Sequence, residues 1–186
     1  VLMLPHVSPN SYAPMPEAWL EGPIPEVPGE LMPVAHSLTD ALREFEAAAS
    51  DLDPGQLWAT PHGAASVGFH LQHVCGAADR LLTYARGEGL TAEQFQALRG
   101  EGQSGDPPVV AEVLIGQVRD TVAAIIDVLR ATDPSTLDAP RSVGRAALPS
   151  TVRGLLFHIA EHTRPHAGQV IVTAKVVRAT STSGSG

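Results

Sequence analysis

The hydrophobic positions of this chain recur at intervals of three and four residues in four separate stretches. Residues at that spacing lie on one face of an α-helix, so each stretch predicts a helix with one buried side. The four predicted helices cover residues 31–50, 66–86, 106–132 and 150–178. The third helix has the clearest apolar stripe, which consists of Val110, Leu114, Val118, Thr121, Ile125 and Leu129.

The ends of these stretches carry residues that commonly begin or stop helices. Ser66 and Ser150 are expected to begin the second and fourth helices, and Asp106, followed by two prolines, the third. Gly87 is expected to stop the second helix, and residues 91–99 to form one short extra helix. No stretch shows the alternation of a strand, so the predicted fold class is all-α, with the helices in a four-helix bundle.

The two ends of the chain differ in composition from the predicted bundle, which covers residues 31–178. Residues 1–30 contain seven prolines, which exclude a helix. This segment is expected to be either a poorly ordered terminus or an extended arm held in place by Trp19 and Leu20. Residues 179–186 are rich in Ser, Thr and Gly and are expected to form a flexible tail.

Composition narrows the classes of partner and compartment. The net charge is −8 and the chain has a single lysine, so nucleic acid is not an expected partner. The one cysteine, Cys75, excludes an internal disulfide, fits a reducing cytosol, and is expected to be a small buried residue rather than a ligand or nucleophile. No apolar run is long enough for a membrane span, and the N-terminus lacks the pattern of a signal peptide, so we expect a cytoplasmic protein without membrane contact.

Histidines at helical spacing are the main candidates for chemistry. His158, His162 and His166 follow one another at intervals of four in the last predicted helix. At 100° per residue, His166 lies about 40° from the centre of the apolar stripe, His162 about 80° and His158 about 120°. The pair His162 and His166 is therefore expected to face the interior, with His158 toward the rim. Inward imidazoles at this spacing are typical of a metal site.

The second predicted helix offers a further imidazole from His70 or His73. Its apolar stripe favours His70 as the more buried of the two, although either could face a neighbouring helix. Gly76, in the middle of the same helix, costs about 1 kcal/mol relative to alanine. We expect the close approach of another helix to compensate for it.

The segment His158–His162 also matches the pattern H-x-x-E-H, in which Glu161 would be the general base of a metallopeptidase. Two observations weigh against this interpretation. Glu161 lies nearly opposite the apolar stripe, and His158 points less inward than His166. A five-residue pattern with three fixed positions also occurs often by chance.

Two motifs resemble those of the DinB/YfiT-like family. Residues 66–74, SVGFHLQHV, and 79–87, DRLLTYARG, resemble its second helix, and EHT followed by HAGQ, at 161–163 and 166–169, resembles the signature of its fourth. The resemblance covers residues 31–178. It implies a four-helix bundle, usually a homodimer, that holds a divalent metal ion, with zinc or nickel expected, through three histidines. By position these would be His73, His162 and His166, so the resemblance selects His73 where the apolar stripe favours His70.

The resemblance also implies a function. Members of the family are linked to transfer of low-molecular-weight thiols, such as bacillithiol or mycothiol, to electrophilic substrates. The alternatives are a hydrolase that uses metal-bound water, and a metal-binding stress-response protein without catalysis. Pro165 departs from the family pattern, which has a polar residue there. Proline inside a helix removes a hydrogen bond to the carbonyl four residues earlier, so a kink or local unwinding is expected beside His162.

Overall fold

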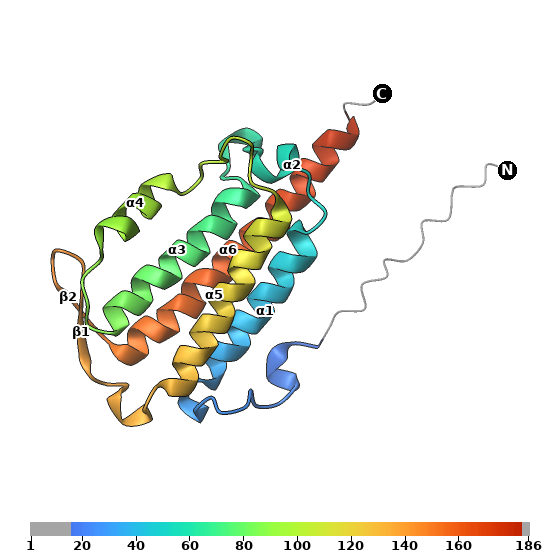
Figure 1. The fold of residues 1–186 in the computed structure, drawn as a ribbon. Coiled ribbons are helices and arrows are strands. Elements are labelled where there is room, and N and C mark those ends of the chain that lie inside the picture. Colours follow the sequence, from blue (N-terminus) through green and yellow to red (C-terminus); the bar gives the residue numbers. More distant parts are fainter. Residues whose placement is uncertain (1–15, 184–186) are drawn as a thin grey trace.

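In a computed structural model that describes residues 16–183, four helices of 18 residues or more run side by side (Figure 1). Helix α6 packs against α1 and α3, and α5 packs against the same two helices from the other side. The described chain is mainly helical, as the sequence predicts. The four helices are α1 (Met32–Ala49), α3 (Val67–Ala85), α5 (Ala111–Ala131) and α6 (Val152–Ser183).

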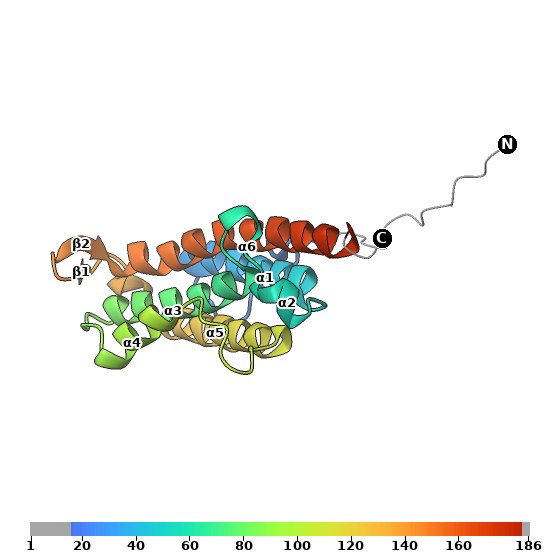
Figure 2. The ribbon, with the colours of Figure 1, turned by 90° about the horizontal axis from the view of Figure 1, so that it is seen from above.

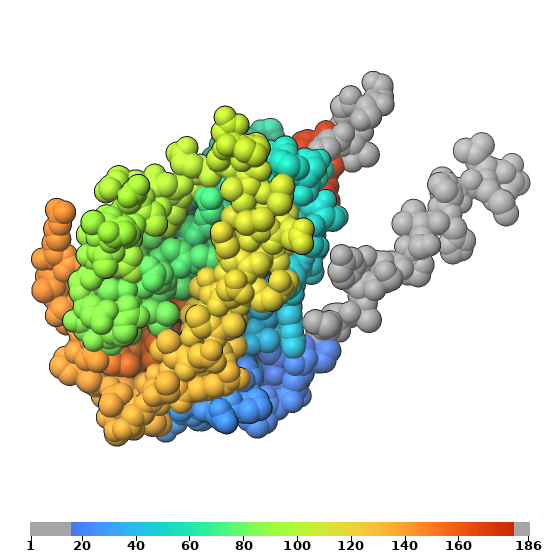
Figure 3. Space-filling model, in the orientation of Figure 1, coloured from blue at the N-terminus to red at the C-terminus, as the bar shows by residue number. Residues whose placement is uncertain are grey.

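Shorter elements connect the long helices. Two of them are the helices α2 (Pro54–Trp58) and α4 (Ala92–Gly100), and α4 lies where the sequence predicts a short helix. The others are the 3₁₀ helices η1 (Ala18–Leu20), η2 (Gly29–Leu31), η3 (Pro61–Gly63) and η4 (Pro134–Thr136), and the strands β1 (Pro140–Val143) and β2 (Leu148–Thr151). In the space-filling view α4 and α5 form two ridges, with part of α3 visible between them (Figure 3).

The core between the long helices is built from aliphatic side chains and one phenylalanine. The apolar stripes predicted from the sequence supply most of it, because side chains at helical spacing all turn toward the same interior. The largest side chains with almost no exposure are Leu31, Leu38, Phe45, Leu57, Leu71, Leu114, Ile125, Leu129, Leu137, Leu156 and Ile159. Among the described residues, no helix combines the length and apolar character that crossing a bilayer requires.

Strands β1 and β2 form an antiparallel hairpin that the pattern of the sequence does not predict. Pro140 pairs with Thr151 and Val143 with Leu148, and the turn between the strands places Gly144 at a φ of 67°. Each strand has four residues, which is too few for an alternating pattern to stand out. The expectation of a connection without strands was therefore wrong for residues 140–151.

The predicted start of the third helix was also wrong, and that of the fourth lies two residues before the observed one. Helix α5 begins at Ala111 rather than at Asp106, because the segment before it closes a turn in which the Val109 N–H donates to the Ser104 carbonyl at 2.7 Å. Helix α6 begins at Val152, since the Thr151 hydroxyl accepts from the Gly154 N–H at 3.0 Å. The Ser66 cap is confirmed, with its hydroxyl accepting from the Phe69 N–H at 3.0 Å.

Helix α6 runs through Pro165 as one helix from Val152 to Ser183 (Figure 2). The local unwinding expected beside His162 is therefore absent. Proline removes the hydrogen bond to the Glu161 carbonyl, but Glu161 lies on an exposed part of the helix where water can take the place of the missing donor. The helix also continues into the segment expected to be a flexible tail, of which only residues 184–186 lie outside the described part.

The described part of the N-terminal segment packs against α1, but not through Trp19 and Leu20. These two side chains are 59% and 61% exposed. The contact instead uses Ala18, which is buried and whose N–H donates to the Asp40 carboxylate at 2.8 Å, and Glu21, which pairs with Arg43. Residues 1–15, which contain the first prolines of the expected arm, lie outside the described residues.

Candidate metal centre

Helices α3 and α6 face one another and bring four histidines together. The Nε2 atoms of His73 and His162 are 2.9 Å apart, and so are the Nδ1 atoms of His70 and His166. The rings of His162 and His166 meet edge to face one turn apart on α6, with centroids separated by 4.7 Å. The two inward residues of α6 thus each meet an imidazole from α3, as their helical spacing predicts.

Three of these residues, His73, His162 and His166, lie close enough together to hold one metal ion. One ring nitrogen from each lies within 4.8 Å of the others. Two imidazole nitrogens on a tetrahedral zinc ion, each about 2.0–2.1 Å from it, are about 3.3 Å apart. The 2.9 Å between the Nε2 atoms of His73 and His162 is about 0.4 Å shorter than that value, so the two rings would have to move slightly apart to hold an ion between them.

The protonation of the group also suits a metal. Burial, and secondarily the neighbouring His162, lowers the pKa of His166 to about 4. Burial and His73 lower the pKa of His162 in the same direction. Both rings are therefore neutral at pH 7 and offer a nitrogen lone pair, which is the form in which histidine binds metals.

His70 is the most buried histidine of the cluster and lies outside the three-residue group. It is 5% exposed, which confirms the expectation that it is more buried than His73. Its burial and the nearby His73 lower its pKa. Because its Nδ1 contacts the Nδ1 of His166, the Nε2 of His166 is the nitrogen left for an ion. The residue selected by the family resemblance, His73, is the one that joins the α6 pair.

Glu101, which no pattern in the sequence indicated, contacts His73 from the turn after α4. The His73 Nδ1 donates to the Glu101 Oε2 at 2.6 Å, and the Arg80 guanidinium donates to Oε1, also at 2.6 Å. The side chain of Glu101 is only 8% exposed. Metal-binding histidines commonly donate their second ring N–H to a carboxylate, so this pair strengthens the fit of the group to a metal.

Gly76 was the signal in the sequence that could have led to Glu101. A Cβ at position 76 would lie 2.5 Å from the Glu101 Oε1 and 2.9 Å from the Arg80 Nη1. The expectation of a close approach at Gly76 was correct, but the approaching group is a carboxylate rather than another helix. Spacing within α3 could not identify it, because Glu101 follows 25 residues later and belongs to no periodic pattern.

Of the H-x-x-E-H residues, only His162 belongs to the three-residue group. His158 is exposed and its Nδ1 bonds to the Glu161 carboxylate at 3.0 Å, with side chains 51% and 60% exposed. The ring of His158 is 5.8 Å from that of His162 between centroids, and His158 is not part of the three-residue group. Its place at the rim agrees with the helical spacing.

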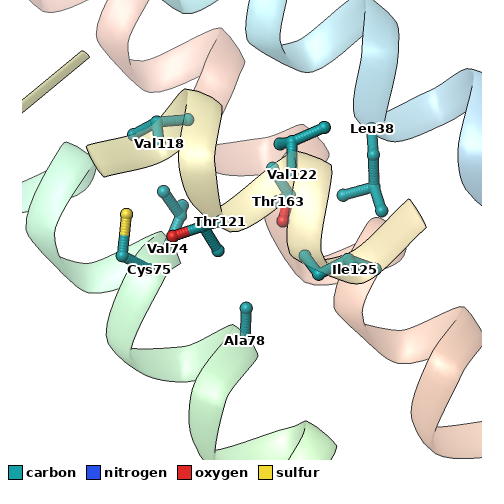
Figure 4. A pocket seen from close by; sticks show the side chains of 9 residues that line it. All are labelled: Leu38, Val74, Cys75, Ala78, Val118, Thr121, Val122, Ile125 and Thr163. Atoms are coloured by element: carbon teal, nitrogen blue, oxygen red, sulfur yellow. The ribbon is translucent and has the colours of Figure 1, made fainter. Parts of the chain in front are cut away.

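Cys75 lies on the side of α3 that faces α5 and lines a small cavity of about 10 Å³ (Figure 4). The cavity is walled by apolar residues of α1, α3 and α5 together with Thr121 and Thr163. Burial raises the pKa of the Cys75 thiol. A cavity of this size is at the lower limit for one water molecule. The side chain is half-buried and is not one of the clustered ligand candidates.

A family model described as the DinB superfamily matches residues 37–170, which is well over half of the chain. The matched range contains all of α3, the turn that carries Glu101, and the part of α6 that carries the clustered histidines. A comparison with curated proteins finds no match.

Proposed function

Because this chain belongs to the DinB superfamily and gathers three histidines around one point, we propose that it binds a divalent metal ion through His73, His162 and His166. The observation that carries the proposal is the three-residue group itself, whose nitrogens lie within 4.8 Å of one another. We favour zinc or nickel, although imidazole nitrogen also suits copper and iron, so the metal analysis below has to identify the ion. Three protein ligands leave coordination positions for a substrate, as in catalytic rather than structural sites.

We further propose that the protein transfers a low-molecular-weight thiol to an electrophile. When bound at this site, a divalent ion favours the thiolate form of a thiol at neutral pH. The thiol releases its proton to water, its sulfur bonds to the electrophilic carbon, and the leaving group departs with the electrons of the broken bond.

The thiol is a cosubstrate in this proposal, and the position of Cys75 supports that choice. Its pKa is raised, and its side chain lines a cavity on the side of α3 that faces α5. The chain's only cysteine is therefore unsuited to act as the nucleophile.

Metal analysis of the purified full chain tests the first part of the proposal. The wild-type protein, supplied with zinc or nickel and freed of excess ion, should carry about one ion per chain. His73→Ala and His162→Ala should each lose it. His62→Asn is a matched control, because His62 is an exposed histidine at a positive φ of 52°, which asparagine tolerates. Unchanged stoichiometry in both alanine variants would exclude the three-histidine site.

A conjugation assay tests the second part. The metal-loaded protein is incubated with monochlorobimane and each of several small thiols, and the fluorescent thioether is followed over time. The proposal expects metal-dependent turnover with at least one thiol, lost in His162→Ala. Hydrolysis of ester or amide substrates without conjugation would instead favour a hydrolase, and metal binding without turnover would favour a non-catalytic role.

A further inference from the structure

Glu101 is a buried carboxylate that touches two ionisable side chains of α3 and lies beside the proposed metal site. Its Oε2 accepts from the His73 Nδ1 and its Oε1 from Arg80, each at 2.6 Å. We propose that Glu101 is a positioning residue, which fixes the His73 ring so that its Nε2 lone pair points to the space between His162 and His166. The inference rests on the proposed metal site.

The hydrogen bond decides which nitrogen of His73 is available. An ionised carboxylate only accepts, so the Nδ1 of His73 must carry the hydrogen. In a neutral ring the Nε2 is then unprotonated, and its lone pair points away from Glu101. The Nε2 is the atom that lies 2.9 Å from the Nε2 of His162, on the side of the three-histidine group. Glu101 thus selects the tautomer that a metal ion requires.

Arg80 makes this arrangement specific for a carboxylate. A carboxylate buried to this degree is costly unless it is paired, and Arg80 provides a charged partner whose own side chain is 12% exposed. Arg80 also donates to one of the two oxygens of Glu101, Oε1. The second oxygen is therefore left to accept from the His73 Nδ1, and both contacts are satisfied at once.

The backbone around Glu101 is shaped to bring the carboxylate to α3. Gly76 leaves the space that Glu101 Oε1 fills, since any Cβ there would lie 2.5 Å from this atom. The side chain of Gln72 accepts from the Gly102 N–H at 2.8 Å and donates to the Gln103 carbonyl at 3.2 Å. Gln72 therefore holds the residues that follow Glu101, and one turn later Gly76 leaves space for the Glu101 side chain.

Glu101→Gln is the sharpest test because it preserves shape and changes only hydrogen bonding. Arg80 donates hydrogens only, so it would bind the amide oxygen and turn the amide NH₂ toward His73. The His73 Nδ1 would then have to accept, and the hydrogen would move to Nε2. We expect the dissociation constant for Zn²⁺, measured by competition with a chelating dye, to rise about 10–100-fold.

Glu161→Gln is the matched control. Glu161 also bonds to the Nδ1 of a histidine, at 3.0 Å, but that histidine is His158, which lies outside the three-residue group. Its zinc affinity should stay within about twofold of the wild-type value. An affinity of Glu101→Gln that matches the wild type, or an equal loss in both variants, would overturn the role of Glu101.

Gly76→Ala removes the same contact by another route. The added methyl group would displace the Glu101 carboxylate, so zinc affinity should fall although both charged residues remain. Gly116→Ala is its control, because Gly116 lies within α5 and a Cβ there meets nothing within 4 Å. Circular dichroism of each variant verifies the helical fold. Wild-type affinity in Gly76→Ala would contradict the proposal.

A measurement on the metal-free protein separates this inference from the proposed function. Nitrogen-15 chemical shifts of the imidazoles report which nitrogen of His73 carries the hydrogen. The wild type should show hydrogen on Nδ1, and Glu101→Gln on Nε2. If the wild-type chain bound no zinc or nickel, the metal site would fail while the tautomer result could still support Glu101. If zinc bound but the tautomer did not change, the positioning role alone would fail.

Discussion

Helix α6 contacts α1 along one side and α3 along another, and the two contacts have different chemistry. Toward α1, charged pairs border the core: Arg164 forms two hydrogen bonds with Glu44, both at 2.9 Å, and Arg178 pairs with Asp51. Toward α3, the meeting side chains include the imidazoles of His162 and His166. One helix therefore serves as scaffold on one side and as half of a candidate site on the other.

The difference shows how a site can be placed inside a helical core without losing the fold. Aliphatic burial contributes stability wherever it occurs, whereas each imidazole removed from water must find a hydrogen-bond partner. The histidines of α3 and α6 meet this requirement by bonding to one another and to Glu101. No buried side-chain nitrogen or oxygen among the described residues lacks a partner. We therefore expect stability to depend mainly on the aliphatic core, and chemistry on the α3 side.

Removal of a large core side chain should give the largest change in stability. Phe45, on α1, has no exposed surface, so Phe45→Ala should lower the free energy of unfolding by about 3–5 kcal/mol. Urea unfolding of the metal-free protein measures this change. At temperatures where the variant remains folded, its metal stoichiometry should equal that of the wild type. Loss of metal binding in the folded variant would show that the two sides of α6 are not independent.

As the pH falls, stability should be lost through the histidines on the α3 side of α6 at a higher pH than through the ion pairs on its α1 side. His166 has a pKa of about 4 in the folded chain, against about 6.5 when unfolded. Between pH 6.5 and 4, His166 therefore binds a proton in the unfolded state but stays neutral in the folded state. The free energy of unfolding decreases as the pH falls from 6.5 toward 4. For a half-buried ring, screened by solvent, we expect a loss of about 1–2 kcal/mol.

The comparison of wild type with His166→Gln isolates this contribution. Urea unfolding at several pH values between 7 and 4.5, in the presence of a chelator, gives the slope of stability against pH for each protein. The variant should have the shallower slope, because it lacks one of the groups whose pKa is lowered. His70 and His162 also have lowered pKa values and should leave part of the slope in place. Equal slopes would mean that His166 takes up its proton at the same pH in both states.

The sequence predicted the features of the molecule that repeat along the chain. Helical periodicity located the long helices and the inward face of α6, and Ser66 marked the start of α3. Resemblance to a family was needed to select His73 over His70, because an apolar stripe reports burial and not which flank meets a neighbouring helix. The structure places both histidines against α6, with His73 in the three-residue group.

The features that the sequence did not predict depend on contacts between distant segments. The β1–β2 hairpin has strands too short for a pattern, and the start of α5 depends on a turn closed by Val109 and Ser104. Glu101 is one of twenty acidic residues, and nothing in its neighbours marks it as the partner of His73. Only Gly76 indicated the contact indirectly, because a glycine in the middle of a helix leaves space for a neighbouring group. Contacts between distant segments leave no repeating spacing in the sequence, so a periodic pattern cannot reveal them.

The ion pair between Arg164 and Glu44 should matter least, although its geometry is good. Both side chains are partly exposed, at 41% and 33%, so water and salt weaken their attraction. Glu44→Gln should lower the free energy of unfolding by less than about 1 kcal/mol, and 1 M salt should remove most of the difference. Zinc affinity should not change, because the pair lies on the α1 side of α6. A change in affinity as large as that expected for Glu101→Gln would mean that strain passes through α6 from its scaffold side to the histidines, and the division between the two sides would have to be abandoned.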